Sequence, residues 1–582
     1  MNFCKNTHCA SFCVPPNPAG AHYSRTTGAP GEYTVSGAGR GLPVLVCTCC
    51  RDHSPIRSNA AVLEEIRHQG GYLEPTRRDD PFCKNPECEM FKVRISLAPD
   101  AYVRFGTTPI GTQRFRCRAC GSTFTGNAPR ATARQRKSHK NRDVFILTVN
   151  KVPISRILET ADIGAETFYR KLQFIHERCQ AFAGQKEARL AEGKIELPKL
   201  YLSTDRQAYI VNWAHRKDRR TIQMNAIGTA DWRSGFVFGM ALNFDGSLDP
   251  KQVEADARDT GDMTLQAPYR KYARLWLSCD YVEAVEDAKV RNAAEKATRK
   301  IIEGTVTDPL MVKAALRYAD ALSRQDVERS DFKNTDVTLP KFGMLVHEQY
   351  TMTAHFQLLS RLLWRAPKVR LFMDQDSGFR AAAIGAFGKR IKERTADLFY
   401  VQVNKEQTAY EKRQAVVAAQ AIRLAYMKKR GLATEREAAV ELMKERIAKA
   451  VKIAKWEDRW VPHAWPIAAE PAKLICWLTD LGDYDLDHQA RLMLLATLHP
   501  IDRFFMQTRR RVSLAERPVT SVRKQRRMWH GYGAYNPAVL QRYLEIYRTY
   551  YNYCLIGQDK KTPAMRLGLA QVPQDPSTIL NA

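Results

Sequence analysis

The residues with the clearest chemistry are two sets of cysteines in a repeated pattern. The stretches "FCKNTHC" (residues 3–9) and "FCKNPEC" (82–88) share their spacing, and each is followed by a Tyr, two Gly and a Cys-x-x-Cys pair. Four thiols in two such pairs match the tetrahedral ligand set that zinc takes in structural sites. The sequence therefore predicts two zinc sites, with the ligands Cys4, Cys9, Cys47 and Cys50 in one and Cys83, Cys88, Cys117 and Cys120 in the other.

The first set carries two additional thiols. Cys13 and Cys49 are competing ligands there, so its ligand assignment is less secure than that of the second set. The alternative for both sets is ordinary buried cysteine without metal. Clustered cysteines in a chain of the reducing cytoplasm are more often metal ligands than disulfides.

A second kind of chemistry comes from acids within or just after strand-like runs. Asp205 stands inside the run that begins at Leu200, where an unpaired carboxylate is costly unless a cation compensates it. Asp374 follows the apolar run "RLFM", so its carboxylate is expected to project from a strand end beside the next helix. Asp376 is close enough to Asp374 to compete for the same role, but its position after the strand end favours capping of the following helix. For Asp205 and Asp374 the alternative is a structural turn or capping acid.

The elements that must position these acids alternate along the chain. Three strand-like runs from Leu200, with a turn at residues 231–235, are expected to pair antiparallel. A helix, the strand ending at Asp374, a second helix and a further strand follow. The charged segments 250–344 and 407–465 are predicted to be helical insertions, because loops of such length are implausible inside a compact domain. The second should be a solvated helix pair, with contacts between protomers or with DNA as hypotheses.

Residues 140–185 carry the pattern of two short amphipathic helices around a turn at Gly164, behind the basic connector "TARQRKSHKNR". This pattern is typical of a helix-turn-helix. A plain helical linker is the alternative. In a helix-turn-helix, the second helix would bring four side chains to a DNA major groove. These are Thr167, Tyr169, Arg170 and Lys171.

The charge of the chain points to a polyanionic partner. Its 91 Lys and Arg exceed its 62 Asp and Glu by a net +29, which favours nucleic acid over a membrane surface or a merely basic exterior. No apolar run reaches the roughly 18 to 20 residues of a membrane-spanning helix, and the start of the chain lacks the pattern of a signal peptide. We therefore expect a cytoplasmic, nucleoid-associated protein with no membrane partner.

The segment "GTQRFRCRACGSTF" at the end of the second cysteine set resembles the zinc ribbons at the front of many bacterial insertion-sequence transposases. Together with the helix-turn-helix and the order of strands and helices, the chain resembles insertion-sequence transposases of the DDE type over most of its length. The resemblance implies an RNase H-like core in which three acids hold two divalent metal ions for phosphoryl transfer. Mg²⁺, or Mn²⁺ in its place, suits such an all-oxygen site.

By motif position, the resemblance assigns the first acid to Asp205 and the second to Asp374. The third stays open between Asp502 and Glu516. Asp502 lies in "HPIDRFFMQTRRRVSLAERP", which resembles the family segment in which an acid is followed at once by one Arg and seven residues later by another. Asp stands there in place of the usual Glu, which makes Glu516 a rival, although Pro518 places it near the helix end.

The arginines of the same segment are the expected contacts to DNA phosphates. They are Arg503, Arg509 and Arg510.

These observations predict a multidomain α/β protein. Zinc ribbons are expected at residues 1–56 and 80–128, and an RNase H-like mixed-sheet core at 198–248, 345–406 and 470–528. The C-terminal region 529–582 is basic and aromatic. The predicted function is a transposase that binds the terminal repeats of a mobile element in double-stranded DNA, as a homodimer or higher oligomer, and cuts and joins its strands. The alternatives are an inactive DNA-binding regulator derived from a transposase and a nuclease limited to hydrolysis.

Overall fold

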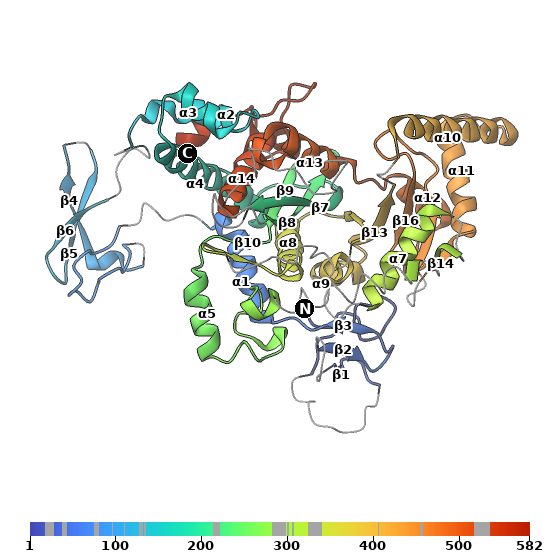
Figure 1. Ribbon diagram of the computed structural model, residues 1–582, viewed down its shortest axis with the longest axis horizontal. Helices are drawn as coiled ribbons and strands as arrows, with labels where there is room; N and C mark the ends of the chain where they lie inside the picture. The colour runs from blue at the N-terminus through green and yellow to red at the C-terminus, as the bar shows by residue number, and fades with distance from the viewer. Residues whose placement is uncertain are drawn as a thin grey trace.

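The computed structural model describes residues 1–581 apart from 18–27, 38–42, 75–80, 96, 110, 127–131, 133–134, 213–220, 282–297, 300–301, 305–307, 324–339, 377, 405–406, 454–457 and 517–535. A mixed sheet of eight strands forms its centre, and two separate three-stranded sheets carry the clustered cysteines (Figure 1). No helix in these described ranges is both long and apolar enough to cross a membrane.

The strands of the central sheet lie in the order β14-β15-β16-β13-β12-β7-β8-β9. The first three along the chain pair antiparallel, as expected, and β12 and β13 then add parallel to β7. The remaining three continue antiparallel beyond β13. The bounds are β7 (Leu200–Asn212), β8 (Thr221–Asp231), β9 (Val237–Leu242), β12 (Val369–Asp374), β13 (Ala396–Val403), β14 (Val451–Ile453), β15 (Asp458–Pro462) and β16 (Lys473–Trp477).

Helices cover both faces of this sheet. Side chains alternate between faces along a strand, so neighbouring residues of β7 contact different helices. Thr204 Oγ1 bonds to Thr229 Oγ1, which in turn bonds to His355 of α8 (Glu348–Leu362). On the other face, Ser203 Oγ accepts a hydrogen bond from Ile501 N of α13 (His499–Arg511). α9 (Phe379–Lys392) links β12 to β13 and packs against α8.

The second insertion differs from the expected helix pair. α10 (Ala409–Arg430) and α11 (Glu435–Ala448) do form, each begun by a Thr capping box. The chain then enters the central sheet as β14 and β15, where the side chain of Trp460 is fully buried. The prediction that residues 407–465 stay outside the sheet was therefore wrong, because the apolar run around Trp460 extends the core.

The first insertion is partly helical. It contains α5 (Pro250–Asp259) and α7 (Pro309–Ser323), and its two ends are joined by a two-stranded sheet of β10 (Phe244–Asp245) and β11 (Met344–Leu345). Most of the charged segment that predicted a helix lies at 282–297, outside the described residues. This region shares a small apolar core with α1 (Asn59–Gly70), a helix between the two cysteine sets that the sequence reasoning did not predict.

Three helices, α2 (Asn141–Thr148), α3 (Ile154–Ala161) and α4 (Ala165–Ala191), occupy the region predicted to be a helix-turn-helix. α4 is 27 residues long, not short as expected, because buried residues such as Phe182 continue along it. Its second half packs against α14 (Pro537–Tyr553), with the rings of Phe182 and Tyr553 in a T-shaped contact at 5.1 Å. The helical layer is thus joined to the C-terminal region.

The C-terminal region ends in two short helices, α15 (Pro563–Leu567) and α16 (Pro576–Asn581). Tyr543, Tyr547 and Tyr551 of α14 recur at helical spacing, and all three are buried. Most of the basic and aromatic tract that begins after Glu516 lies at 517–535, outside the described residues.

Candidate functional site

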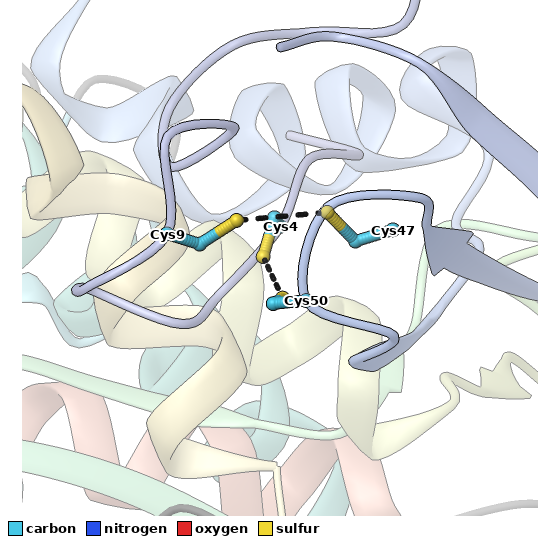
Figure 2. A group of neighbouring side chains, drawn as sticks. All are labelled: Cys4, Cys9, Cys47 and Cys50. Atoms are coloured by element: carbon cyan, nitrogen blue, oxygen red, sulfur yellow. Dashed lines mark hydrogen bonds between the residues drawn. The ribbon is translucent and has the colours of Figure 1, made fainter. Parts of the chain in front are cut away.

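The four thiols predicted for the first zinc site lie together (Figure 2). The Sγ atoms of Cys4 and Cys50 are 3.4 Å apart, and those of Cys9 and Cys47 are 3.7 Å apart. Zn–S bonds of about 2.3 Å in a tetrahedron require sulfurs about 3.8 Å apart. All four ligand atoms lie within 4.8 Å of one another, so this group could hold a zinc ion.

The second set has nearly the same geometry. The Sγ atoms of Cys83 and Cys120 are 3.5 Å apart, and those of Cys88 and Cys117 are 3.8 Å apart. These four sulfurs also lie within 4.8 Å of one another. Both sets therefore suit zinc and use the thiols that the repeated spacing predicted.

The same local structure positions the ligands in both sets. β1 (Tyr33–Ser36), β2 (Val44–Cys47) and β3 (His53–Pro55) form one sheet. β4 (Tyr102–Thr107), β5 (Gln113–Cys117) and β6 (Thr123–Thr125) form the other. Tyr33 pairs with Cys47, and Tyr102 pairs with Cys117. Each Tyr hydroxyl donates to carbonyls of the preceding cysteine loop, which fixes that loop against its sheet.

The competing thiols of the first set have other contacts. Cys49 is exposed, and its Sγ donates to the carbonyl of Gly28 at 2.9 Å. Cys13 faces α9, where a Cβ added to Gly388 would lie 2.2 Å from its Sγ. Neither belongs to the group of four. Cys13 instead fills the contact between the first cysteine set and the central domain.

One thiol in each set ionises readily. The hydroxyl of Ser122, 2.9 Å from Cys120 Sγ, is the main cause that lowers the pKa of Cys120 to about 6. Burial opposes ionisation of Cys47, but hydrogen bonds from the amides of Cys50 and Cys49 and from Ser11 outweigh it and lower its pKa to about 7. Burial, by contrast, raises the pKa of Cys9 in the first set to about 12. Zinc binds thiolates, so metal binding would deprotonate the remaining thiols. The sequence analysis did not single out Ser122. A Ser two residues after the last cysteine of a set is close enough to hydrogen-bond to its thiol, and this spacing could have identified it.

We call residues 1–57 the first cysteine module and residues 81–126 the second. The first is docked on the central domain, because Phe3 and Phe12 belong to the main apolar cluster. Burial also lowers the pKa of Lys5, in the same module, to about 7. The second module has its own small core around Tyr102 and Phe124, and Figure 1 shows it standing apart from the rest.

The acids predicted to be catalytic lie on the central sheet. Asp205 is in β7 with its side chain almost buried, and Asp374 ends β12. Thr204 pairs with Met373 in these parallel strands, so Asp205 and Asp374 occupy the next positions of the register. Residues at matching positions of neighbouring strands project from the same face. The two carboxylates therefore share a face, and their Oδ1 atoms accept from the amides of Arg206 and Gln375.

α13 crosses the same face and brings Asp502 to it. Ile501 N donates to Ser203 Oγ at 3.2 Å, and the Gln207 side chain lies beside Phe505 and Arg509 of the same helix. Asp205 lies between Ser203 and Gln207 on β7, and Asp502 lies in the helical turn between Ile501 and Phe505. Asp502 therefore lies on the helix that packs against the strand carrying Asp205, and its side chain is half-buried.

The close approach of α13 depends on a glycine that the sequence reasoning missed. Gly228 of β8 is the register partner of Asp205. A Cβ at this position would lie 3.0 Å from Ile501 Cδ1 and 3.3 Å from the ring of Phe505. The signal in the sequence was a glycine inside a strand, which often marks a close approach of another segment.

The three acids are less tightly grouped than the cysteines. Within the described ranges, the groups of three or more Cys, His, Asp or Glu whose ligand atoms all lie within 4.8 Å are the two cysteine sets. Carboxylates repel one another without a cation between them. A face bearing three carboxylates nevertheless has the oxygen donors that Mg²⁺ prefers.

Asp376 does not cap α9, so that expectation was wrong. Its carboxylate forms an ion pair with Arg206, which also pairs with Glu348 of α8. Arg206 projects from the face of β7 opposite to Asp205, because adjacent strand residues alternate. Asp376 therefore belongs to an ion-pair network on the α8 side.

Glu516, the rival third acid, lies beyond the end of α13. Its side chain is 41% exposed and pairs with Lys151 in the loop between α2 and α3, at 3.2 Å. The same loop contacts the helix end, since Lys151 N donates to the carbonyl of Arg511 at 2.6 Å. Asp502 lies on the helix that crosses β7, and Glu516 does not. This difference favours Asp502 as the third acid.

The arginines predicted to contact DNA differ in exposure. Arg503 and Arg510 are exposed on α13. Arg509 is half-buried, and its guanidinium lies beside the Gln207 amide. Arg509 therefore also helps to hold α13 on β7.

The start of α4 exposes two of its four predicted DNA contacts, and Thr167 is half-buried. Tyr169 is 42% exposed, and the exposed Arg170 pairs with Glu166. The prediction for Lys171 was wrong. Its side chain is buried, and its ammonium donates to Asn141 Oδ1 and to two carbonyls of the basic connector, because the helix face that it occupies packs against that connector.

A polar cavity of about 490 Å³ lies where the connector meets α4. Its lining combines both signs of charge with amide and hydroxyl groups. The lining residues are Gln135, Arg136, Glu166, Thr167, Arg170 and Lys171.

Comparison of the chain with models of protein families, with curated proteins and with solved structures found no match.

Proposed function

We propose that the chain is a DNA transposase that binds the ends of a mobile element and catalyses strand cleavage and strand transfer. The observation that carries this proposal is the placement of three acids. Asp205 and Asp374 lie at matching positions of two parallel strands, one step beyond the Thr204–Met373 pair, on the face that α13 crosses with Asp502. Polynucleotidyl transfer needs carboxylates converging from separate segments on one site.

The topology supports the same proposal. Strand order β9-β8-β7-β12-β13, with the first three antiparallel and the next two parallel to β7, is the arrangement that the proposed RNase H-like core requires. The net charge of +29 adds a reason for a polyanionic substrate.

The acids would hold Mg²⁺, which when bound supplies activation of the attacking oxygen and neutralisation of charge at the scissile phosphate. The chain's own groups position the DNA around that site. The exposed guanidiniums of Arg503 and Arg510 are suited to phosphate oxygens. Gly228 lets α13, the helix that carries Asp502, pack closely on the sheet face that carries Asp205.

Recognition of the element ends is assigned to α3 and α4, as a helix-turn-helix, with the second cysteine module beside it. Tyr169 and Arg170 are exposed near the start of α4, and the polar cavity next to them is lined by Arg136. Such groups provide the contacts to base edges and phosphates that position a protein on duplex DNA.

The decisive experiment uses the purified full chain, Mg²⁺ and DNA that carries the ends of the element encoding it. We expect nicking at those ends and joining to a target plasmid. Asp374→Asn should abolish both reactions and leave end binding within about twofold, since it removes a ligand without touching the recognition helices. If Asp374→Asn nicked DNA normally, Asp374 would not belong to the active site. If the parent protein nicked the DNA without joining it to the target, the chain would be a nuclease.

A matched pair of variants settles the third acid. We expect Asp502→Asn to lower nicking by at least about 100-fold, and Glu516→Gln, which removes only the exposed contact with Lys151, to stay within about threefold of the parent. The nicking rate of each variant is measured by separating nicked product from supercoiled substrate on a gel. The reverse order of effects would transfer the role to Glu516.

A further inference from the structure

The outer face of the second module's sheet carries an aromatic ring between cations. Val103 and Arg116 are register partners in β4 and β5, and Arg114 pairs with Thr125 of β6. Alternation places the zinc ligand Cys117 on the opposite side of the sheet from Arg116. We call this outer surface the arginine face. Its residues are Val103, Phe105, Arg114, Arg116, Thr123 and Thr125.

Phe105 is the centre of this face. Its side chain is 45% exposed, and the guanidiniums of Arg114 and Arg116 lie 5.6 and 5.9 Å from its ring centre. Arg114 also donates to Thr123 Oγ1 at 3.4 Å, which holds its guanidinium near the sheet. An exposed ring with two cations against it combines a surface for stacking with two donors for phosphate.

The first module provides an internal comparison. Its register places Thr34 opposite Val46 and Ser36 opposite Val44, with His53 and Pro55 on the third strand. These are the counterparts of the arginine face, and they contain no Arg, Lys, Phe, Tyr or Trp. Val46 is also buried. The first module therefore forms the same cysteine cluster and the same sheet without an exposed aromatic ring or arginines. Metal binding thus does not explain why the second module carries these side chains.

We propose that the arginine face of the second module binds a DNA strand with unstacked bases. Phe105 stacks on an exposed base, and Arg114 and Arg116 contact the flanking phosphates. A duplex presents base edges in its grooves, whereas an aromatic ring requires the flat face of a base. The positive charge of the face and of the chain matches a polyanion.

This inference rests on the proposed function for the choice of DNA, but it does not involve the three acids. Transposition exposes unpaired strands where element ends are cut, and such a strand would be the physiological ligand. Binding without cleavage can be measured alone. Failure of one proposal is therefore distinguishable from failure of the other.

The experiment uses the full zinc-loaded chain with Asp374→Asn, in buffer without Mg²⁺. The probe is a 30-nucleotide single strand with photoreactive 5-iododeoxyuridine, and the matching duplex is the comparison. We expect the single strand, and not the duplex, to crosslink to Phe105. Phe105→Ala should remove the crosslink and weaken single-strand binding by about tenfold, in line with one lost stacking contact.

Two further variants separate stacking from charge and from folding. Arg114→Gln with Arg116→Gln should reduce the slope of log affinity against log salt by about 1.4, since each contact to single-stranded DNA contributes about 0.7. Ser36→Ala, at the counterpart of Phe105 in the first module, should change nothing. Every variant should retain two zinc ions per chain.

Three results would overturn the proposal. The first is a crosslink to the first module, or none to residues 102–126. The second is unchanged affinity of Phe105→Ala with both zinc ions bound. The third is equal loss of duplex and single-strand binding in Phe105→Ala, which would assign the face to duplex DNA.

Discussion

The two cysteine modules have the same ligands and the same three-stranded sheet, yet they stand in different relations to the rest of the chain. Phe3 and Phe12 of the first module are buried in the main apolar cluster. The matching residues of the second module, Phe82 and Phe91, are only half-buried. The comparison teaches that the cysteine loops specify the fold of each module. Residues other than the cysteines decide whether the module docks on the central domain or stays separate.

One pair of residues shows where the modules diverge. Cys13 and Lys92 occupy matching positions, and both have positive φ, 59° and 61°. Cys13 packs beside Gly388 of α9, where there is no room for even one added carbon. The ammonium of Lys92 instead lies 5.0 Å from the ring centre of Phe91. The short side chain thus fits against α9 in the docked module, and the long charged one lies over an aromatic ring of its own module.

The largest effect should come from removing one zinc ligand in each module. Cys47→Ser is expected to lower the main thermal unfolding transition by about 5 °C or more, because loss of the metal frees Phe3 and Phe12 from the main core. Cys117→Ser should unfold only the second module and leave that transition in place. Calorimetry with zinc analysis measures both. Equal shifts would contradict the difference between the modules.

The next effect concerns the matching phenylalanines. Phe12→Ala should cost about 3 to 5 kcal/mol of unfolding free energy, because its side chain is 3% exposed and its removal leaves a cavity in the main cluster. Phe91→Ala should leave the main transition unchanged. Guanidinium titrations of the two variants make the comparison, and a large loss for Phe91→Ala would show that the second module is also docked.

An exchange at the diverging position should have an intermediate effect. Cys13→Lys is expected to cost about 1 to 3 kcal/mol, since the longer side chain must displace α9 near Gly388. Faster amide exchange in residues 385–391 would locate the damage. Lys92→Cys should be neutral for the central domain. If both variants behaved alike, docking would not depend on this residue.

The smallest expected effect is at the start of the chain. The Asn2 amide donates to the carbonyl of Arg57 at 2.8 Å and accepts from its N–H at 3.0 Å. The counterpart in the second module is Pro81, which has no such side chain. Asn2→Ala should cost about 1 kcal/mol in the main transition, measured by guanidinium titration. A cost above about 3 kcal/mol would contradict the assignment of only two hydrogen bonds, between the start of the module and the segment before α1, to this side chain.

The features that could be predicted from the sequence depend on local patterns. Cysteine spacing is repeated, so the ligand sets followed from the chain alone. The alternating runs around Asp205 and the apolar run before Asp374 likewise predicted the strands on which both acids lie.

The features that could not be predicted depend on contacts between distant segments. Lys171 looked like a DNA contact because only the tertiary structure places Asn141 and the connector over its ammonium. The extra strands β14 to β16 depend on pairing with β13, for which a short apolar run gives no register. The difference between Asp502 and Glu516 appears only when α13 is seen to cross β7.

The hold of the α2–α3 loop on the last turn of α13 has a mechanical consequence. Backbone and side chain of Lys151 bond to the carbonyls of Arg511 and Arg509, and Arg511 bonds back to Asn150. In the proposed transposase, this contact would link the helices that bind DNA to α13, the helix that carries Asp502. In the proposed function, a shift of the DNA-binding helices would thus change the position of Asp502 relative to Asp205, and cleavage would depend on how the chain sits on the element end.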